Sequence, residues 1–301
     1  MDYITSHLGE LAGVVTAICW TATSMAFESA GKKVGSLSVN LIRLVMALVL
    51  LGLFTTITRG HFLPTGASTH AWFWLSLSGL VGFVIGDLLL FQAFVVIGAR
   101  VSMLIMSLTP PLTALFGLMI LGETMSLINI FGMLLTIVGI ALVILGRPVK
   151  GKKFSFNFPL SGLLLAFGGA AGQALGLVLS KLGMGDLDAF MSTQIRVIAG
   201  IVGFSLVFFA MRRWGNIWKA LKNGSAMGRI SIGAFFGPFL GVSFSLLAVK
   251  YTTTGIASTL MALTPVMIIA PAHFIFKEKI TTKEIIGAFI AVMGVVVFFV
   301  F

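Results

Sequence analysis

The sequence predicts an all-α integral membrane protein in which ten transmembrane helices form two inverted repeats of five. Three observations support this fold class: the composition, the spacing of the apolar runs, and an internal repeat. Of the 301 residues, 58% are hydrophobic and 10% are charged, and the mean hydropathy is +1.10. A soluble domain carries about 25% charged residues, and a disordered chain lacks this much apolar surface. The single cysteine, Cys19, excludes a disulfide scaffold.

The apolar runs are long enough to cross a membrane, and glycine, proline and charged residues mark their ends. One spanning helix requires about 20 mostly apolar residues, so ten spans use about two thirds of the chain. Residues 1–10 lack the basic start of a cleavable signal peptide, so the first span is expected to be retained. The predicted spans are residues 9–27, 37–58, 71–97, 99–121, 125–146, 158–180, 188–211, 228–249, 254–276 and 281–301.

Basic residues in the short loops predict the orientation. An even number of spans places both termini on one side, and basic loops stay in the cytoplasm. The side of the termini carries three basic loop residues, Arg59, Lys181 and Lys250, against fifteen on the other side. Both termini are therefore expected outside the cytoplasm, and the net charge of +11 requires no nucleic-acid partner. The fifteen are Lys32, Lys33, Arg100, Arg147, Lys150, Lys152, Lys153, Arg212, Arg213, Lys219, Lys222, Arg229, Lys277, Lys279 and Lys283.

An internal repeat appears when the chain is shifted by 155 residues. The shift aligns Leu108-Thr109-Pro110 with Leu263-Thr264-Pro265 and Glu123 with Glu278. Apolar identities are common in this composition, whereas a Leu-Thr-Pro triplet followed by Glu at equal spacing is not. The two glutamates end spans four and nine, and we interpret them as caps at the membrane interface.

A shift of 153 residues extends the repeat upstream, because it pairs Ile42-Arg43 with Ile195-Arg196. The chain therefore divides into two five-span halves, residues 1–150 and 151–301. Since five is odd, the second half enters the membrane inverted relative to the first. Inverted repeats of this kind are typical of alternating-access transporters, which bind their solute near the middle of the membrane.

Several motifs follow one another in a fixed order along the first half. They are a Trp within span one, an Arg in span two, a Gly-Asp pair with downstream aromatics in span three, and Leu-Thr-Pro running to Gly-Glu: Trp20, Arg43, Gly86, Asp87, Phe91, Phe94, Gly122 and Glu123. In this order the chain resembles the EamA-type branch of the drug/metabolite transporter superfamily over essentially its whole length. The resemblance implies a ten-helix bundle in which helices one to four and six to nine surround a central cavity. It also implies transport of small organic metabolites, often export of amino acids or related compounds.

Two residues of opposite charge fall inside spans two and three. At 1.5 Å per residue, Arg43 lies about 9 Å deep and Asp87 about 15 Å deep, and an arginine side chain bridges the difference. A charge near the bilayer centre costs at least about 2.5–3.5 kcal/mol, which favours pairing. The pair is either a structural link between the spans or a coupling site in which Asp87 accepts a proton or cation under the control of Arg43.

Arg196, the repeat counterpart of Arg43, faces no equivalent carboxylate, because Val242 occupies the position that matches Asp87. Its expected polar neighbours are Gln173 and Gln194, and the outer-loop residues Lys181, Asp186 and Asp188 are further candidates. A guanidinium that lines a water-filled cavity is suited to bind a carboxylate or phosphate. The alternative is that Arg196 extends toward the outer headgroups.

Polar and aromatic residues at similar depth define a candidate substrate site. Trp20 and Ser24 of span one offer a ring and a hydroxyl, and Gln173 is the repeat counterpart of Trp20. The resemblance implies that this helix faces the cavity; packing is the alternative for Trp20. The substrate-binding candidates are therefore Trp20, Ser24, Thr109, Gln173, Arg196 and Thr264.

Pro110 and Pro265 lie about ten residues into spans four and nine. Proline removes a helical hydrogen bond and bends the helix, so these residues are candidate hinges, with simple packing bends as the alternative. Glycines at spacing four in spans six and eight predict close helix packing: Gly168, Gly172, Gly176, Gly233, Gly237 and Gly241.

The sequence contains no metal-ligand cluster and no nucleotide-binding loop, so we expect no cofactor and no ATP-driven pumping. It also lacks the converging acids and bases of a membrane-embedded enzyme. We therefore expect a monomeric secondary transporter in the plasma or inner membrane that exports a small organic metabolite such as an amino acid, with protons or a counter-solute as coupling partners. The alternative is a flippase of a lipid-linked sugar or phosphate carrier, with Arg196 as a phosphate ligand.

Overall fold

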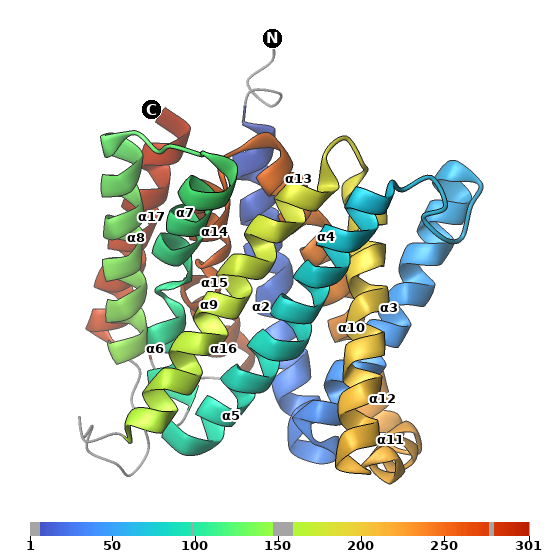
Figure 1. The fold of residues 1–301 in the computed structure, drawn as a ribbon. Helices are drawn as coiled ribbons and strands as arrows, with labels where there is room; N and C mark the ends of the chain where they lie inside the picture. Colours follow the sequence, from blue (N-terminus) through green and yellow to red (C-terminus); the bar gives the residue numbers. More distant parts are fainter. Residues whose placement is uncertain (1–6, 98, 147–158, 277–279, 301) are drawn as a thin grey trace.

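The computed structural model describes residues 7–97, 99–146, 159–276 and 280–300. Within these residues, ten helices are long and apolar enough to cross a membrane, as the sequence predicts. They alternate in direction, and the first and last of them approach the marked chain termini at one end of the bundle, which we call the terminal end (Figure 1). The spans are Leu8–Val34, Ser36–Arg59, Thr69–Ala93, Val101–Leu121, Leu127–Gly146, Leu160–Met184, Ala189–Met211, Gly224–Tyr251, Thr254–Pro271 and Thr282–Val300.

Several spans are built from more than one helical element. The elements in chain order are α2 (Leu8–Val34), α3 (Ser36–Arg59), α4 (Thr69–Gly79), η1 (Leu80–Gly86), α5 (Asp87–Ile97), α6 (Ala99–Met106), α7 (Thr109–Leu121), α8 (Leu127–Gly146), α9 (Leu160–Met184), α10 (Ala189–Met211), α11 (Trp214–Leu221), α12 (Gly224–Ala234), η2 (Phe235–Gly241), α13 (Val242–Tyr251), α14 (Thr254–Met261), α15 (Thr264–Met267), α16 (Ile269–Phe276) and α17 (Thr282–Val300). The labels η1 and η2 denote π-helical segments.

The interruptions of the helices recur after 155 residues. The π-helical segments begin at Leu80 and Phe235, and the breaks within spans four and nine follow Met106 and Met261. Each pair differs by 155 positions, as the sequence repeat does. Corresponding elements of the two halves run in opposite directions along the bundle, as α2 and α9 show in Figure 1. The two halves of the chain therefore share one pattern of helices and breaks.

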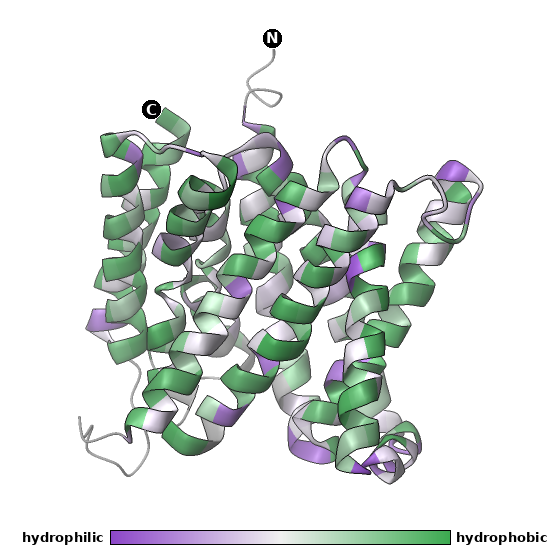
Figure 2. Cartoon of the chain, in the orientation of Figure 1, coloured by the Kyte–Doolittle hydropathy of each residue, from purple (hydrophilic) through white to green (hydrophobic). Residues whose placement is uncertain are grey.

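The outside of the bundle is apolar along the length of the helices, while hydrophilic residues gather toward the ends (Figure 2). Phe209 is 76% exposed and Ile57 84% exposed, although both belong to spans. Exposed side chains of this size are costly in water and favourable against lipid tails. The surface therefore matches a bilayer better than it matches an aqueous solvent.

Glycines permit the closest contacts between the spans. Gly172 of α9 lies against Gly86, since a Cβ added at Gly172 would approach the Gly86 Cα to 3.0 Å. A Cβ at Gly176 would likewise lie 2.9 Å from the Gly82 Cα. Small residues let helix backbones approach, so these glycines position α9 directly against η1. The predicted packing role of the glycine stripe is therefore confirmed at these two positions.

Three local features differ from the prediction. The first span continues past residue 27 to Val34, because Lys32 and Lys33 occupy its last turn, where cations favour the helix dipole, and Gly35 ends it at φ 81°. A short amphipathic helix, α11, occupies the loop that was expected to connect spans seven and eight. Spans four and nine are interrupted by turns, whereas the prolines predicted only a bend.

Candidate functional site

A cavity of about 350 Å³ lies among helices from both halves of the chain. Its walls are mostly apolar, with three ionisable side chains and several hydroxyl groups. The lining residues are Trp20, Thr23, Ser24, Arg43, Leu44, Phe83, Asp87, Leu90, Met103, Met106, Ser107, Thr109, Ile140, Gln173, Leu177, Arg196, Gly237, Pro238, Val242, Ser245, Ser258, Met261, Ala262, Thr264 and Pro265.

The cavity brings together nearly all residues named as candidates from the sequence. The six substrate-site candidates line it, and so do Arg43, Asp87 and Pro265. Pro110 is buried in the first turn of α7 and is not among the lining residues. Sequence reasoning missed Phe83 and Pro238, which belong to the π-helical segments η1 and η2. Pro238 lies inside span eight, and this proline was a sequence signal from which the irregular segment η2 could have been predicted.

Each interrupted span presents its break to the cavity. Helix α6 ends at Met106 and α7 begins at Thr109, while α14 ends at Met261 and α15 begins at Thr264. In both cases the proline lies at the first or second position of the new helix, where its missing N–H group is not needed. The breaks therefore precede the prolines. The hinge role of Pro110 and Pro265 stays a prediction.

Arg43 and Asp87 form a buried ion pair beside the cavity. Arg43 Nη2 lies 2.5 Å from Asp87 Oδ2, and the two side chains are 16% and 12% exposed. Gln173 Nε2 donates to the other carboxylate oxygen, Oδ1, at 2.9 Å, and also to the Gly82 carbonyl oxygen at 3.2 Å. Both oxygens of Asp87 therefore accept a hydrogen bond from a neighbouring span. The contact joins α3 to α5, and Gln173 adds α9.

Arg196 is buried, with 5% of its surface exposed, and lines the same cavity. Its guanidinium carbon lies 4.7 Å from the centre of the Phe83 ring, a cation–π distance. Its Nε atom is buried without a hydrogen-bond partner, and no ion pair to Arg196 occurs among the described residues. Glycine at position 79 allows this arrangement, because a side chain there would clash with the Arg196 carbonyl oxygen.

The partners expected for Arg196 bind elsewhere. Gln173 donates to Asp87, and Gln194 donates to the Phe62 carbonyl oxygen at 2.6 Å. Asp188 forms an ion pair with Arg59 at 3.0 Å, and Lys181 lies at the terminal end. This corrects the expectation of polar company from the two glutamines. The buried guanidinium is left with the Phe83 ring and the cavity.

Trp20 lies on α2 between the cavity and the second π-helical segment. A Cβ added at Gly241 would lie 2.8 Å from Trp20 Cδ1, so the indole rests on this glycine. The ring is half-buried and also packs against a buried apolar cluster that includes Leu246 and Ala248. Trp20 therefore both packs against its neighbours and lines the cavity, two roles that the sequence left as alternatives.

A polar cluster at the terminal end joins the two halves. Lys181 Nζ lies 2.5 Å from Glu123 Oε1, and Glu123 Oε2 accepts hydrogen bonds from the Thr254 N–H at 2.8 Å and hydroxyl at 2.7 Å. Lys181 also donates to the Thr252 carbonyl oxygen at 2.7 Å. Glu123 thus links α7 to α9 and α14, whereas the sequence suggested an interface cap. Its repeat counterpart Glu278 lies outside the described residues.

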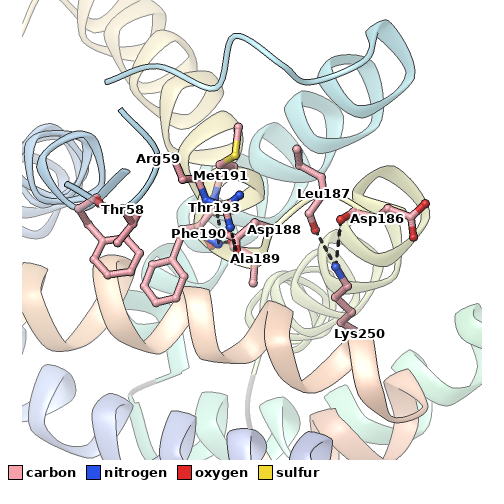
Figure 3. Close-up of polar contacts among 11 residues, drawn as sticks. Thr58, Arg59, Asp186, Leu187, Asp188, Ala189, Phe190, Met191, Thr193 and Lys250 are labelled. Carbon is pink, nitrogen blue, oxygen red and sulfur yellow. Dashed lines mark hydrogen bonds and ion pairs between the residues drawn. The ribbon is translucent and has the colours of Figure 1, made fainter. Parts of the chain in front are cut away.

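The other two cations of the terminal end are also bound (Figure 3). Arg59 pairs with Asp188, which in addition caps α10 by accepting from the Phe190 N–H at 2.9 Å. Lys250 donates to the carbonyl oxygens of Asp186 at 3.2 Å and Leu187 at 3.0 Å.

The described part of the chain contains no group of three or more His, Cys, Asp or Glu suited to a metal ion.

A bundle of ten membrane-spanning helices around a cavity with charged and polar walls defines a multi-pass membrane protein of the transporter type. The sequence model of the EamA-like transporter family matches the chain twice, over residues 7–145 and 160–300. The chain therefore belongs to the EamA-like transporter family of the drug/metabolite transporter superfamily. The resemblance seen in the sequence is confirmed.

The following two proteins are among those that are similar to this chain. A protein of Haemophilus influenzae, described as uncharacterized, is 27% identical over 103 residues, which are 34% of this chain and 75% of that protein. A protein of known crystal structure superposes with a TM-score of 0.76 over 96% of this chain and 95% of its own, at 18% identity. At that identity the superposition supports the fold alone.

Proposed function

We propose that the chain is a secondary transporter that exports a small organic metabolite by alternating access between its two halves. The observation that carries the proposal is the cavity, because equivalent breaks of both halves line it: Thr109 and Thr264 begin the helices that follow these breaks. Interrupted helices expose backbone groups, which favours solute binding at such points. Residues 1–150 and 151–301 would act as the two inverted repeats, with Trp20 and Arg196 among the substrate contacts.

The direction of insertion belongs to the same proposal. The terminal end would face away from the cytoplasm of the plasma or inner membrane, because only three basic loop residues lie there. Each of these three, Arg59, Lys181 and Lys250, is bound to an acidic side chain or to carbonyl oxygens. The basic residues of the opposite loops would face the anionic inner leaflet.

Alternating access requires that the terminal end opens and closes. The contacts of Glu123 with Lys181 and Thr254 have to break before the terminal end can open. They bridge α7 of the first half to α9 and α14 of the second. The Arg43–Asp87 pair joins α3 and α5 within the first half, so we assign it a holding role. Protons or a counter-solute would supply the driving force.

The test is solute efflux from proteoliposomes. Each batch of vesicles is preloaded with one radiolabelled amino acid, carboxylate or amine, and the loss of label is followed over time. We expect efflux of at least one solute above that of protein-free vesicles. Replacing Trp20 by Ala should abolish that efflux or reduce it at least tenfold, because the ring forms part of the cavity wall. The matched control is Trp218→Ala, since Trp218 is 67% exposed on α11 and lines no part of the cavity.

Two results would contradict the proposal. If no solute of the panel leaves the vesicles faster than from protein-free controls, the metabolite class is wrong. If Trp20→Ala is folded and transports at the wild-type rate, the cavity is not the solute site. Folding of the variant is checked by size-exclusion chromatography and circular dichroism.

A further inference from the structure

The cavity carries an unbalanced positive charge. The ionisable residues among its lining are Arg43, Asp87 and Arg196. Arg43 and Asp87 neutralise each other at 2.5 Å, and Gln173 occupies the remaining carboxylate oxygen. Arg196 has no such partner in the described parts of the chain. A solute that enters the cavity therefore meets one free guanidinium and no free carboxylate.

Three buried polar atoms of the lining residues have no hydrogen-bond partner, and each of them can donate. The Nε atoms of Arg43 and Arg196 are buried without partners, and a guanidinium can donate but never accept. The buried Thr109 hydroxyl also lacks a partner and can donate. A buried donor without an acceptor is unfavourable, so a ligand that brings acceptor oxygens relieves this cost. An ammonium group would bring only further donors.

Arg196 is held in a fixed position before any ligand arrives. Phe83 lies under its guanidinium at 4.7 Å, and a Cβ added at Gly82 would lie 3.5 Å from Nη2. The group is thus held between α10, which carries it, and η1. A guanidinium with a fixed plane binds the two oxygens of a carboxylate with little loss of conformational freedom.

The rest of the wall is suited to an apolar body. Met103, Met106 and Met261 line the cavity beside Trp20 and Leu177. Methionine is flexible and polarizable, so it adapts to aliphatic and aromatic groups alike. The volume of about 350 Å³ lies within the range of small-molecule pockets, about 300–1,000 Å³.

From these four observations we propose that the cavity selects small amphipathic organic anions, in particular monocarboxylates with an aliphatic or aromatic body. Arg196 binds the carboxylate, and the methionine-rich wall with Trp20 holds the apolar body. This inference rests on the proposed transport function and narrows its substrate class. It excludes amine cations, because the cavity offers their ammonium group no unpaired carboxylate.

The experiment compares four probes that share one phenyl body: 3-phenylpropionate, 3-phenylpropionamide, phenylalanine and phenethylamine. Binding to the purified full-length protein in detergent is measured by isothermal titration calorimetry. We expect 3-phenylpropionate to bind at least tenfold more tightly than the amide or the amine, with phenylalanine between them. In Arg196→Gln the affinity for 3-phenylpropionate should fall at least tenfold, while that for the amide changes less than twofold. Arg213→Gln is the control, because Arg213 is exposed and outside the cavity.

Arg196→Lys keeps the inference testable if the Gln variant does not fold. Lysine retains the charge and loses the two-pronged geometry, so the preference for the anion over the amine should remain while its affinity falls. In the wild type, equal or tighter binding of phenethylamine, or no measurable binding of 3-phenylpropionate at millimolar concentration, overturns the inference.

A lipid headgroup is the other source of an anion, and dioctanoylphosphatidylglycerol tests it. Saturable binding of this lipid that depends on Arg196, without binding of 3-phenylpropionate, overturns the soluble carboxylate in favour of a lipid phosphate. Trp20-dependent transport of a neutral or cationic solute would overturn the anion inference alone and leave the proposed transporter intact. Failure of transport with all solutes would instead contradict the proposed function.

Discussion

Replacing Asp87 by Asn should destabilise the protein, because it leaves the Arg43 guanidinium without its counter-charge. The side chains of the pair are 16% and 12% exposed, and Asp87 as a residue is 8% exposed. Removing one partner of a buried ion pair costs about 3–5 kcal/mol. Asparagine keeps an acceptor oxygen for Arg43 or Gln173, so we expect a loss at the lower limit of this range, about 3 kcal/mol.

The double variant Arg43→Gln/Asp87→Asn separates the contact from the individual side chains. With both charges removed, no unpaired charge remains, so the loss should be smaller than the sum of the two single losses. Residues in direct contact couple by about 0.5–3 kcal/mol, and at 2.5 Å we expect at least about 1 kcal/mol here. The assay is unfolding of the detergent-solubilised protein, followed by circular dichroism as the fraction of SDS is raised.

Arg59 and Asp188 provide a matched pair of the same residue types at the surface (Figure 3). Their side chains are 46% and 29% exposed and lie 3.0 Å apart. Exposed ion pairs contribute about 0–1 kcal/mol, so Arg59→Gln should cost much less than Asp87→Asn. Strictly additive losses for the buried pair, or an equal cost for Arg59→Gln, would refute the assignment of a strong structural contact to Arg43 and Asp87.

Two further predictions concern the terminal end. A phosphatase reporter fused after Phe301 should be active outside the cytoplasm, whereas a fusion after Asn223 should be inactive; the reverse pattern would refute the proposed orientation. Glu123→Gln should lower the free energy of unfolding by about 1–3 kcal/mol, because it leaves the Lys181 ammonium, 25% exposed, without its carboxylate. Lys222→Gln at the opposite end is the control, and equal stability of the two variants would contradict a bridging role for Glu123.

The sequence alone determined the ten spans, the family and the division of the chain into two repeated halves. These properties are local, since the length and composition of an apolar run decide whether it can cross a membrane. The contact between Arg43 and Asp87 could also be predicted from the sequence, because helix geometry converts residue number into depth in the membrane. The depth of a residue follows from its own span and requires no knowledge of neighbouring helices.

Only the tertiary structure decided which side chains meet across the bundle. Gln173 bonds to Asp87 and Gln194 to the Phe62 carbonyl, which leaves Arg196 with Phe83. Glu123 reaches Lys181 in the other half. These spans carry apolar residues around most of their circumference, so the periodicity of the sequence does not reveal which face each helix turns to its neighbours. The rotation of each helix follows from close contacts such as Gly172 on Gly86, which form only when the whole bundle is assembled.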